Sequence, residues 1–485
     1  MREKRAPWLN VGAAFLLLAL VLFLGWKYVS YNSVPIDLPQ HLLIAKKMLA
    51  GWMPYKDIIE NKPPGAYISL IPAVLIAGKS LQLLAAMGLL LVAANSFLVY
   101  LIGSRLRDSR TGLVAGAIFV MLSIADAFTG FALLTEPISN FFVLLMANAL
   151  LAARNGPLFF AAGVFAACAI SVKQTSALAL PLACMLLPWK KQMWRNLGAF
   201  AAGFFVVVLL IVAYLAIGGA LWDSLWCTVL FALQYNSGSA DRTLFVLSGT
   251  VILIAPAVFF AALGAFALRG RKELALAAWA LLSLIAVCAS YSFMHQYVFL
   301  FPPMALLAAF GLEGTVKWLR HAVSGNVGRA VSASLYLFVL LLVLCFCWSP
   351  FTIPDETAYA EDALGAAAYL NANMALEDKV FAFPKDVIVY YLTDKDPFTR
   401  GTFFSDRWVI EAPMDELEAQ VLEPLRSTSP RYVVIVTEHD SIEVLASKNY
   451  LAVMAYVDGN YHLEKKIGGF NIYEKNEEGG NGGAG

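Results

Sequence analysis

The chain has 485 residues, of which 60% are hydrophobic and 14% are charged, and its formal net charge is +1. Soluble domains carry charge on about a quarter of their residues, so a chain this apolar has too few polar side chains to cover a soluble globule. The composition therefore excludes a soluble enzyme and predicts a membrane protein.

The near-neutral total is the sum of two parts of opposite charge. Residues 1–351 hold 24 Lys and Arg against 11 Asp and Glu, and the rest hold 11 (35 − 24) against 23 (34 − 11). The first part is therefore net +13 and the second net −12. We predict a basic membrane domain over 1–351, an acidic water-soluble domain over 352–475, and a flexible Gly-rich tail over 476–485.

Eleven apolar segments of the membrane domain have the composition of membrane-spanning helices. We interpret the first as an uncleaved helix and not as a signal peptide, because it lacks a small-residue cleavage site and further spans follow. The predicted spans cover residues 8–28, 81–103, 111–129, 132–152, 157–171, 175–189, 196–217, 245–268, 274–290, 298–312 and 331–350.

Basic residues fall in alternate loops between these segments and predict the orientation of the chain. With eleven spans, 16 of the 24 basic residues lie on one side, which the positive-inside rule makes cytoplasmic. This arrangement requires a break near Lys173. It places the N-terminus in the cytoplasm and the acidic domain outside the inner or plasma membrane. The basic loops contain Arg2–Arg5, Arg105–Arg110, Arg154, Lys190–Arg195, Arg269–Lys272 and Lys317–Arg329.

A long polar loop, residues 29–80, separates the first two spans and is predicted to have its own structure outside the membrane. Asp37 and Gln40 have capping-box spacing, and apolar residues then recur at helical period until Gly51 ends the helix. The run 66–77 is apolar but too short to span. Asp37 is either a simple helix N-cap or a general base toward a hydroxyl group.

Short polar motifs occur in the predicted loops and at the ends of the predicted spans. In the outer loop they are Asp37, Gly51-x-x-Pro54-Tyr55-x-Asp57 and Lys62-Pro63-Pro64-Gly65. Later in the chain they are Leu134-Thr135-Glu136-Pro137, Val172-Lys173-Gln174-Thr175, and His295-Gln296-Tyr297 with Pro302-Pro303. In their residues and their order these motifs resemble those of the GT-C glycosyltransferases, in particular the bacterial group of aminoarabinose, protein-mannosyl and rhizobial lipopolysaccharide-core transferases.

The resemblance implies an α-helical polytopic membrane fold with a small α/β extracytoplasmic domain that caps the active site. It implies a multi-pass enzyme of the cell envelope that moves a hexosyl or pentosyl group from a polyprenyl-phosphate donor. The acceptor is a hydroxyl group of a glycan, lipid or protein, and no nucleic acid is involved. By their places in the motifs, Asp37 is the expected base of an inverting reaction, and Lys62 and Lys173 are the expected phosphate ligands. Further active-site candidates are Asp57, Glu136, His295 and Tyr297.

One position departs from the family pattern and bears on metal binding. In the aminoarabinose transferases the residue before the Lys-Pro motif is an acid implicated in binding a metal, and here it is Asn61. Glu136 and His295 remain as candidate ligands, but two residues do not make a metal site. The sequence therefore assigns no metal ligands and leaves a divalent metal as an open alternative.

Ordinary structural roles compete with these assignments. Glu136 can cap a helix or pair with a cation, Lys173 can extend to the outer headgroups, and His295 can be an interfacial hydrogen-bonding residue. Lys46 and Lys47 have the pattern of a solvated or headgroup-facing edge.

For the whole chain, the alternative function is a transporter or flippase of a lipid-linked or cell-envelope component, and a third is a non-catalytic assembly protein. Transporters more often show paired repeats and charges near the bilayer midplane, and the sequence contains neither.

The acidic domain alternates helix and strand patterns, as a small α/β domain does. It has no Gly-rich phosphate loop. Helices are predicted over 358–373 and 415–427, and strands over 379–383, 387–392, 432–436 and 470–473.

Overall fold

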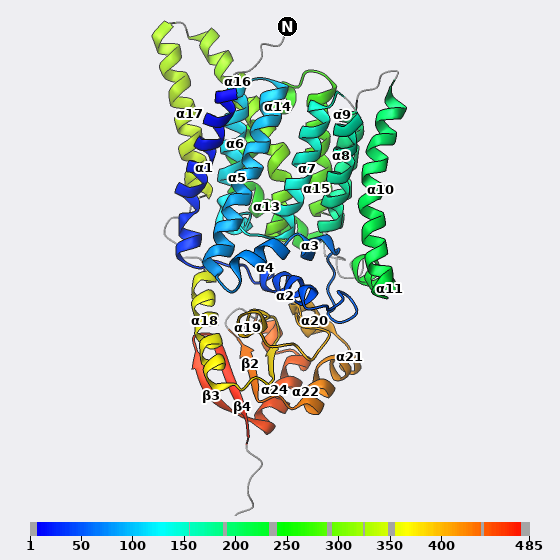
Figure 1. Cartoon of the computed structure of the whole chain (residues 1–485). Coiled ribbons are helices and arrows are strands. Elements are labelled where there is room, and N and C mark those ends of the chain that lie inside the picture. Colours follow the sequence, from blue (N-terminus) through cyan, green and yellow to red (C-terminus); the bar gives the residue numbers. More distant parts are fainter. Residues whose placement is uncertain are drawn as a thin grey trace, which may run out of the picture. The chain divides into compact units, whose positions relative to one another are not determined.

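The computed structural model describes residues 7–154, 156–187, 192–231, 240–288, 293–323, 325–347, 355–437 and 441–476, which form two compact units (Figure 1). Unit 1 comprises Met1–Ser30, Asn61–Ser69 and Gln82–Thr352, and unit 2 comprises Tyr31–Glu60, Leu70–Leu81 and Ile353–Gly485. Loop 29–80 therefore contributes to both units. Most of the predicted tail over 476–485 lies outside the described residues.

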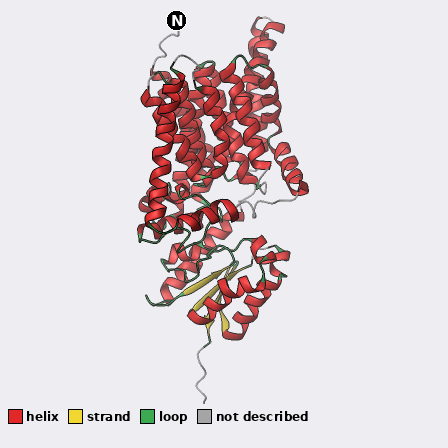
Figure 2. Cartoon of the chain, turned by 90° about the vertical axis from the view of Figure 1, so that its right-hand side faces the viewer, coloured by secondary structure: helices red, strands yellow, loops and turns green. Residues whose placement is uncertain are grey.

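Unit 1 is helical (Figure 2). Each of the eleven predicted segments contains a helix or a broken pair of helices. These are α1 (Pro7–Ser30), α5 (Leu81–Leu106), α6 (Ser109–Ile124), α7 (Thr135–Ala152), α8 (Gly156–Val172), η2 (Gln174–Ala179) with α9 (Leu180–Leu186), α10 (Met193–Ile217), α13 (Ala240–Leu253) with α14 (Ala255–Phe266), α15 (Arg271–Cys288), η4 (Met294–Leu300) with α16 (Phe301–Ala322), and α17 (Gly325–Cys347). The shorter elements of unit 1 are α3 (Gly65–Ile68), η1 (Asp126–Phe128), α11 (Leu221–Leu225) and η3 (Trp226–Phe231).

The lengths of these helices identify a multi-pass membrane protein. Among the described residues, five helices are long and apolar enough to cross a membrane, or six if the pair α13 and α14, bent by 88°, is counted as one span. The break predicted near Lys173 is present, because α8 ends at Val172, Lys173 is extended and η2 begins at Gln174.

Small residues allow the helices of unit 1 to approach one another closely. Lipid supplies no hydrophobic force between helices, so van der Waals contact between small residues holds them together. A methyl group on Gly163 of α8 would overlap the carbonyl oxygen of Phe200 on α10, and one on Gly203 would overlap that of Phe160. These two backbones therefore pack at a separation that only glycine permits.

Unit 2 contains a four-stranded sheet with the order β1-β2-β4-β3. β1 (Val380–Phe383) pairs in parallel with β2 (Tyr432–Val436), and both strands are buried at every residue. β2 pairs antiparallel with β4 (Phe470–Lys475), which forms a hairpin with β3 (Tyr461–Ile467). The helices of unit 2 are α2 (Leu38–Leu49), α4 (Ile71–Ala77), α18 (Asp355–Asn373), α19 (Ile388–Thr393), α20 (Asp406–Glu411), α21 (Met414–Leu417), η5 (Glu418–Leu422), α22 (Glu423–Thr428), α23 (Ile442–Leu445) and α24 (Lys448–Asn460).

The small α/β domain is confirmed, and one predicted strand is wrong. Residues 387–392 form most of α19 and not a strand. All six residues of this helix are buried, so the run shows no alternation, and periodicity cannot distinguish a short buried strand from a short buried helix. The sequence did not predict β3, because most of its residues are exposed and several are charged, which hides the apolar pattern of a strand.

Lysine–aspartate pairs join loop 29–80 to the rest of unit 2. The ammonium of Lys46 binds the carboxylate of Asp394, which also lies 2.5 Å from the ammonium of Lys79, and Lys47 binds Asp396. Burial raises the pKa of Asp394, but hydrogen bonds from Lys46 and Lys79 outweigh it and hold that pKa below its usual value. The interpretation of Lys46 and Lys47 as a solvated edge is therefore wrong.

Backbone and side-chain hydrogen bonds add to this attachment. The Thr402 hydroxyl donates to the Gln40 amide oxygen at 2.8 Å, and the Ile59 N–H donates to the Arg400 carbonyl at 2.9 Å. Arg400 in turn donates to the Tyr55 carbonyl at 2.9 Å. Helix α2 and the turn after it are thus integral parts of the C-terminal unit.

The close packing of α8 and α10 gives a testable prediction. We expect Gly163→Ala to destabilise the protein by about 1–3 kcal/mol, because the added methyl group forces two backbones apart. The matched control is Gly198→Ala on α10, where a methyl group meets nothing within 4 Å and better helix propensity leaves stability equal or slightly higher. Thermal unfolding of the two variants in detergent measures the difference, and equal midpoints would contradict the packing.

Candidate active site

Three predicted site residues from distant parts of the chain form one cluster in unit 1. The ammonium of Lys173 binds the Oε1 atom of Glu136, and Nε2 of His295 lies 3.6 Å from the same oxygen. The Thr135 hydroxyl donates to the other carboxylate oxygen at 3.0 Å. Glu136 is only 2% exposed and Lys173 7%, so both charges are removed from water and depend on each other.

Breaks in the helices place each member of this cluster. Glu136 lies in the first turn of α7, where the helix dipole favours a carboxylate, and Pro137 follows it without the loss of a helical hydrogen bond. Lys173 is the extended residue between α8 and η2. His295 lies near the start of η4, before the two prolines of α16.

Two aromatic rings contact members of the cluster. The Lys173 ammonium lies 5.6 Å from the centre of the Phe299 ring, a distance at which a cation is attracted to the ring face. The His295 ring stacks on Phe293, with centroids 5.5 Å apart and an angle of 8° between the planes. Tyr297, two residues after His295, is fully buried in the same element.

The segment that carries Lys62 is bound to the break that carries Lys173. The Gln174 amide donates to the Asn61 carbonyl at 3.3 Å and to the Thr228 carbonyl at 3.1 Å. The Lys62 ammonium donates to the Asn61 side-chain oxygen at 2.6 Å. Two of the motifs that are far apart in the sequence therefore meet in unit 1.

Polar residues that the sequence did not single out complete these contacts. Asn140, in the second turn of α7, donates to the Val298 carbonyl of η4 at 2.7 Å, which binds the helix of Glu136 to the element of His295. The sequence contains a signal for Asn140, because it is a polar residue inside an apolar span and such a residue needs a specific partner.

The residues near Asn61 do not fit a divalent metal. The Asn61 side-chain oxygen accepts from the Lys62 ammonium, and both oxygens of Glu136 are engaged, by Lys173 and by Thr135. A carboxylate held by an ammonium group is a poor ligand for a second cation. No step that involves a metal is therefore assigned to this cluster.

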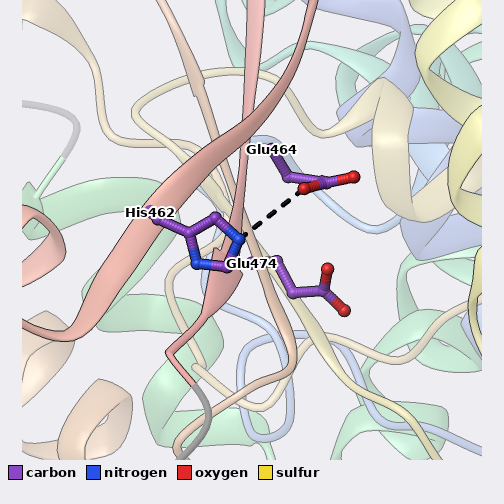
Figure 3. A group of neighbouring side chains, drawn as sticks. All are labelled: His462, Glu464 and Glu474. Carbon is purple, nitrogen blue, oxygen red and sulfur yellow. Dashed lines mark ion pairs between the residues drawn. The ribbon is translucent and has the colours of Figure 1, made fainter.

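Within the described part of the chain, one group of three side chains has the spacing of metal ligands, and it lies in unit 2. The ligand atoms of His462, Glu464 and Glu474 lie within 4.8 Å of one another on β3 and β4 (Figure 3). Glu464 accepts a hydrogen bond from Tyr369 at 3.0 Å, and Glu474 accepts one from Arg431 at 3.0 Å. These contacts account for both carboxylates without a metal.

Asp37 and Asp57 belong to unit 2 and differ in their surroundings. Asp37 occupies the N-cap position of α2, yet its side chain makes no capping hydrogen bond, and Gln40 of the expected capping box binds Thr402 instead. Asp37 is half-buried, and no hydrogen-bond or ionic partner for its carboxylate occurs among the residues that the structure describes. The simple capping role is therefore wrong.

Asp57 has a local structural contact. Its carboxylate accepts from the Met53 N–H at 2.7 Å, which closes a tight turn. Within that turn Tyr55 is fully buried and has a φ of +71°, in the left-handed region. Asp57 therefore stabilises the conformation of the loop.

Comparison with known proteins identifies the fold. No protein-family model and no curated protein sequence matches the chain. The solved structure of ArnT from Cupriavidus metallidurans bound to undecaprenyl phosphate matches with a TM-score of 0.65 and 14% identity, over 95% of this chain and 98% of that one. The archaeal oligosaccharyltransferase AglB from Archaeoglobus fulgidus, in complex with an inhibitory peptide and a dolichol-phosphate, matches with a TM-score of 0.55 and 12% identity, over 97% of this chain and 74% of that one.

Both solved proteins have the GT-C architecture that the motifs predicted. The GT-C-like helical fold with a small C-terminal α/β domain is therefore confirmed, at identities that establish the fold alone.

The buried pair of Glu136 and Lys173 gives a second prediction. We expect Lys173→Met to destabilise the protein by about 3–5 kcal/mol, because it leaves a buried carboxylate without its cation. The double variant Glu136→Gln/Lys173→Met should recover most of this loss, since neither charge remains. The free energies of unfolding in detergent give the double-mutant cycle, with Lys56→Met at an exposed site as the control. If the changes in free energy caused by the two substitutions simply add in the double variant, Glu136 and Lys173 are not coupled.

Proposed function

We propose that this chain is a membrane glycosyltransferase that moves a sugar from a polyprenyl-phosphate donor to an acceptor hydroxyl group, with inversion at the anomeric carbon. The observation that carries the proposal is the half-buried carboxylate of Asp37, which has no partner among the described residues and stands where the family motif has its acid. The fold supports it, because the similar structures contain undecaprenyl phosphate and a dolichol-phosphate.

In the proposed reaction Asp37 is the general base. The acceptor oxygen forms a bond to the anomeric carbon while its proton passes to the Asp37 carboxylate. The bond from the anomeric carbon to the phosphate oxygen breaks, and its electron pair leaves with the lipid phosphate. A single displacement of this kind inverts the anomeric configuration and needs no covalent sugar–enzyme intermediate.

Cations lower the barrier because negative charge grows on the departing phosphate. Lys62 and Lys173 are the proposed phosphate ligands. A lysine ammonium has three N–H donors, and Lys173 directs one to Glu136, which holds the cation in a buried position. Glu136 is thus a positioning residue, with His295 and Tyr297 in the same surroundings and Asp57 as a support of the loop.

The donor and acceptor follow from the same proposal. The polyprenyl chain binds among apolar helices at the lipid boundary, and the acceptor is a glycan, lipid or protein at the outer face of the cell membrane. The N-terminus lies in the cytoplasm in this arrangement, and the C-terminal domain lies outside.

The role of Asp37 gives the third prediction. We expect Asp37→Asn to lower the rate of sugar transfer by about 10²–10⁴-fold, because an amide cannot accept the proton. Stability should not change, since the described residues offer this carboxylate no partner. Transfer from a polyprenyl-phosphate sugar by the full chain in detergent measures the rate, and thermal unfolding checks the fold. The matched control is Asp415→Asn, an exposed carboxylate of the same unit. Full activity of Asp37→Asn would overturn the assignment.

A transfer assay also separates the enzyme from a transporter or flippase. Incubation of the wild-type chain with a radiolabelled polyprenyl-phosphate sugar and a cell-envelope extract should give a labelled product whose glycosidic bond resists mild acid. Movement of the labelled lipid across a vesicle membrane without a new glycosidic bond would favour the transporter.

A further inference from the structure

A basic pocket lies at the end of unit 1 where α5 and α7 finish and α15 begins. Its volume is about 260 Å³, and it is lined by Leu106 and Leu151, by the cations Arg105, Arg269, Arg271 and Lys272, and by Glu273. Nothing in the proposed glycosyl transfer uses these residues.

The single acid of this pocket does not neutralise its cations. Glu273 is bound by Arg107, which is not part of the lining, with distances of 3.1 and 3.2 Å between guanidinium and carboxylate. It also accepts from the backbone N–H of Arg269 at 2.5 Å. Its charge is therefore balanced by a cation outside the lining. Of the lining cations, Arg105 binds the Asn148 side-chain oxygen and Arg271 donates to the Cys184 carbonyl at 2.9 Å.

Two of these cations have no side-chain partner among the described residues. The guanidinium of Arg269 and the ammonium of Lys272 are exposed, and neither is paired with any group among the described residues. Strongly basic pockets between membrane helices at one membrane surface are typical binding sites for phosphate headgroups. The donors here match a phosphate, with guanidinium groups suited to bidentate contacts.

The pocket and the Glu136 cluster lie at opposite ends of α7. Glu136 and Leu151 belong to the same helix, α7, and fifteen residues of helix rise about 22 Å, which is most of the thickness of a hydrocarbon core. The loops that contribute its cations are those that the positive-inside rule places in the cytoplasm.

Exposed apolar side chains precede and follow the pocket's loop in sequence. Phe266, at the end of α14, is 90% exposed, and Leu274, in the first turn of α15, is 51% exposed. Acyl chains can cover such side chains, whereas a free phosphate ion cannot. These surroundings favour a lipid over a soluble phosphate compound.

We propose that this pocket binds the phosphate group of an anionic phospholipid of the leaflet opposite to the Glu136 cluster, with Arg269 and Lys272 as its main ligands. The lipid occupies a site that is separate from the proposed catalytic residues. This proposal does not depend on the glycosyltransferase activity.

Native mass spectrometry of the full chain, released from detergent with added lipid, tests the proposal. Wild-type protein should retain phosphatidylglycerol in preference to phosphatidylcholine, and Arg269→Gln/Lys272→Gln should lower that preference roughly 10- to 30-fold, from the loss of two charges near the lipid phosphate. The control, Arg195→Gln/Lys317→Gln, removes two charges from the same predicted side but outside the pocket, and should keep the preference. Thermal unfolding without lipid should be unchanged in both variants.

Three outcomes would overturn the proposal. Equal retention of phosphatidylglycerol by the two double variants would show that the basic residues act only through overall charge. Equal retention of the two lipids by the wild-type chain would exclude an anionic lipid site. Displacement of the lipid by millimolar inorganic phosphate would show that the pocket takes a free anion and not a lipid headgroup.

Discussion

A charge buried in a helical membrane protein must have a partner, and this constraint organises unit 1. The ammonium of Lys173 and the carboxylate of Glu136 are both withdrawn from water, and each is stable there because of the other. Their contact requires that α8 break at Lys173 and that α7 begin at Thr135, so the ion pair and the helix ends depend on each other. His295 joins the same carboxylate from a third element.

Pairing of opposite charges also gives the acidic residues of unit 2 a structural role. Lys46, Lys47 and Lys79 lie in loop 29–80, and each contacts Asp394 or Asp396. Helix α2 is therefore attached to the C-terminal unit by charge, and Asp37 stands at the start of that helix. The orientation of Asp37 is thus tied to the packing of residues that are far away in the sequence.

Clusters of charged side chains occur at both ends of unit 1, and they differ in net charge and in exposure. At the Glu136 end, opposite charges are paired and buried, and the Lys173 ammonium lies next to the Phe299 ring. At the Arg269 end, positive charge is in excess and open to solvent. An enclosed, balanced cluster is suited to hold groups in a defined geometry. An open, unbalanced one is suited to attract an anion from its surroundings.

The sequence by itself determined the features that depend on local composition. The apolar segments of unit 1, the break at Lys173, helix α18 and the strands β1, β2 and β4 follow from hydrophobicity and from residues that interrupt it. The GT-C fold also followed from short motifs in their order, since each motif lies at a helix end or in a loop.

Only the tertiary structure decided which residues meet. The packing of distant elements brings Lys173 to Glu136 and Lys47 to Asp396. No local sequence pattern predicts these pairs. Residues 387–392 are buried and lie mostly in α19. A short run that is buried on every side lacks the periodicity that distinguishes a strand from a helix. Asp37 has the sequence pattern of a helix cap, but its carboxylate makes no capping hydrogen bond and Gln40 of the expected capping box binds Thr402 instead.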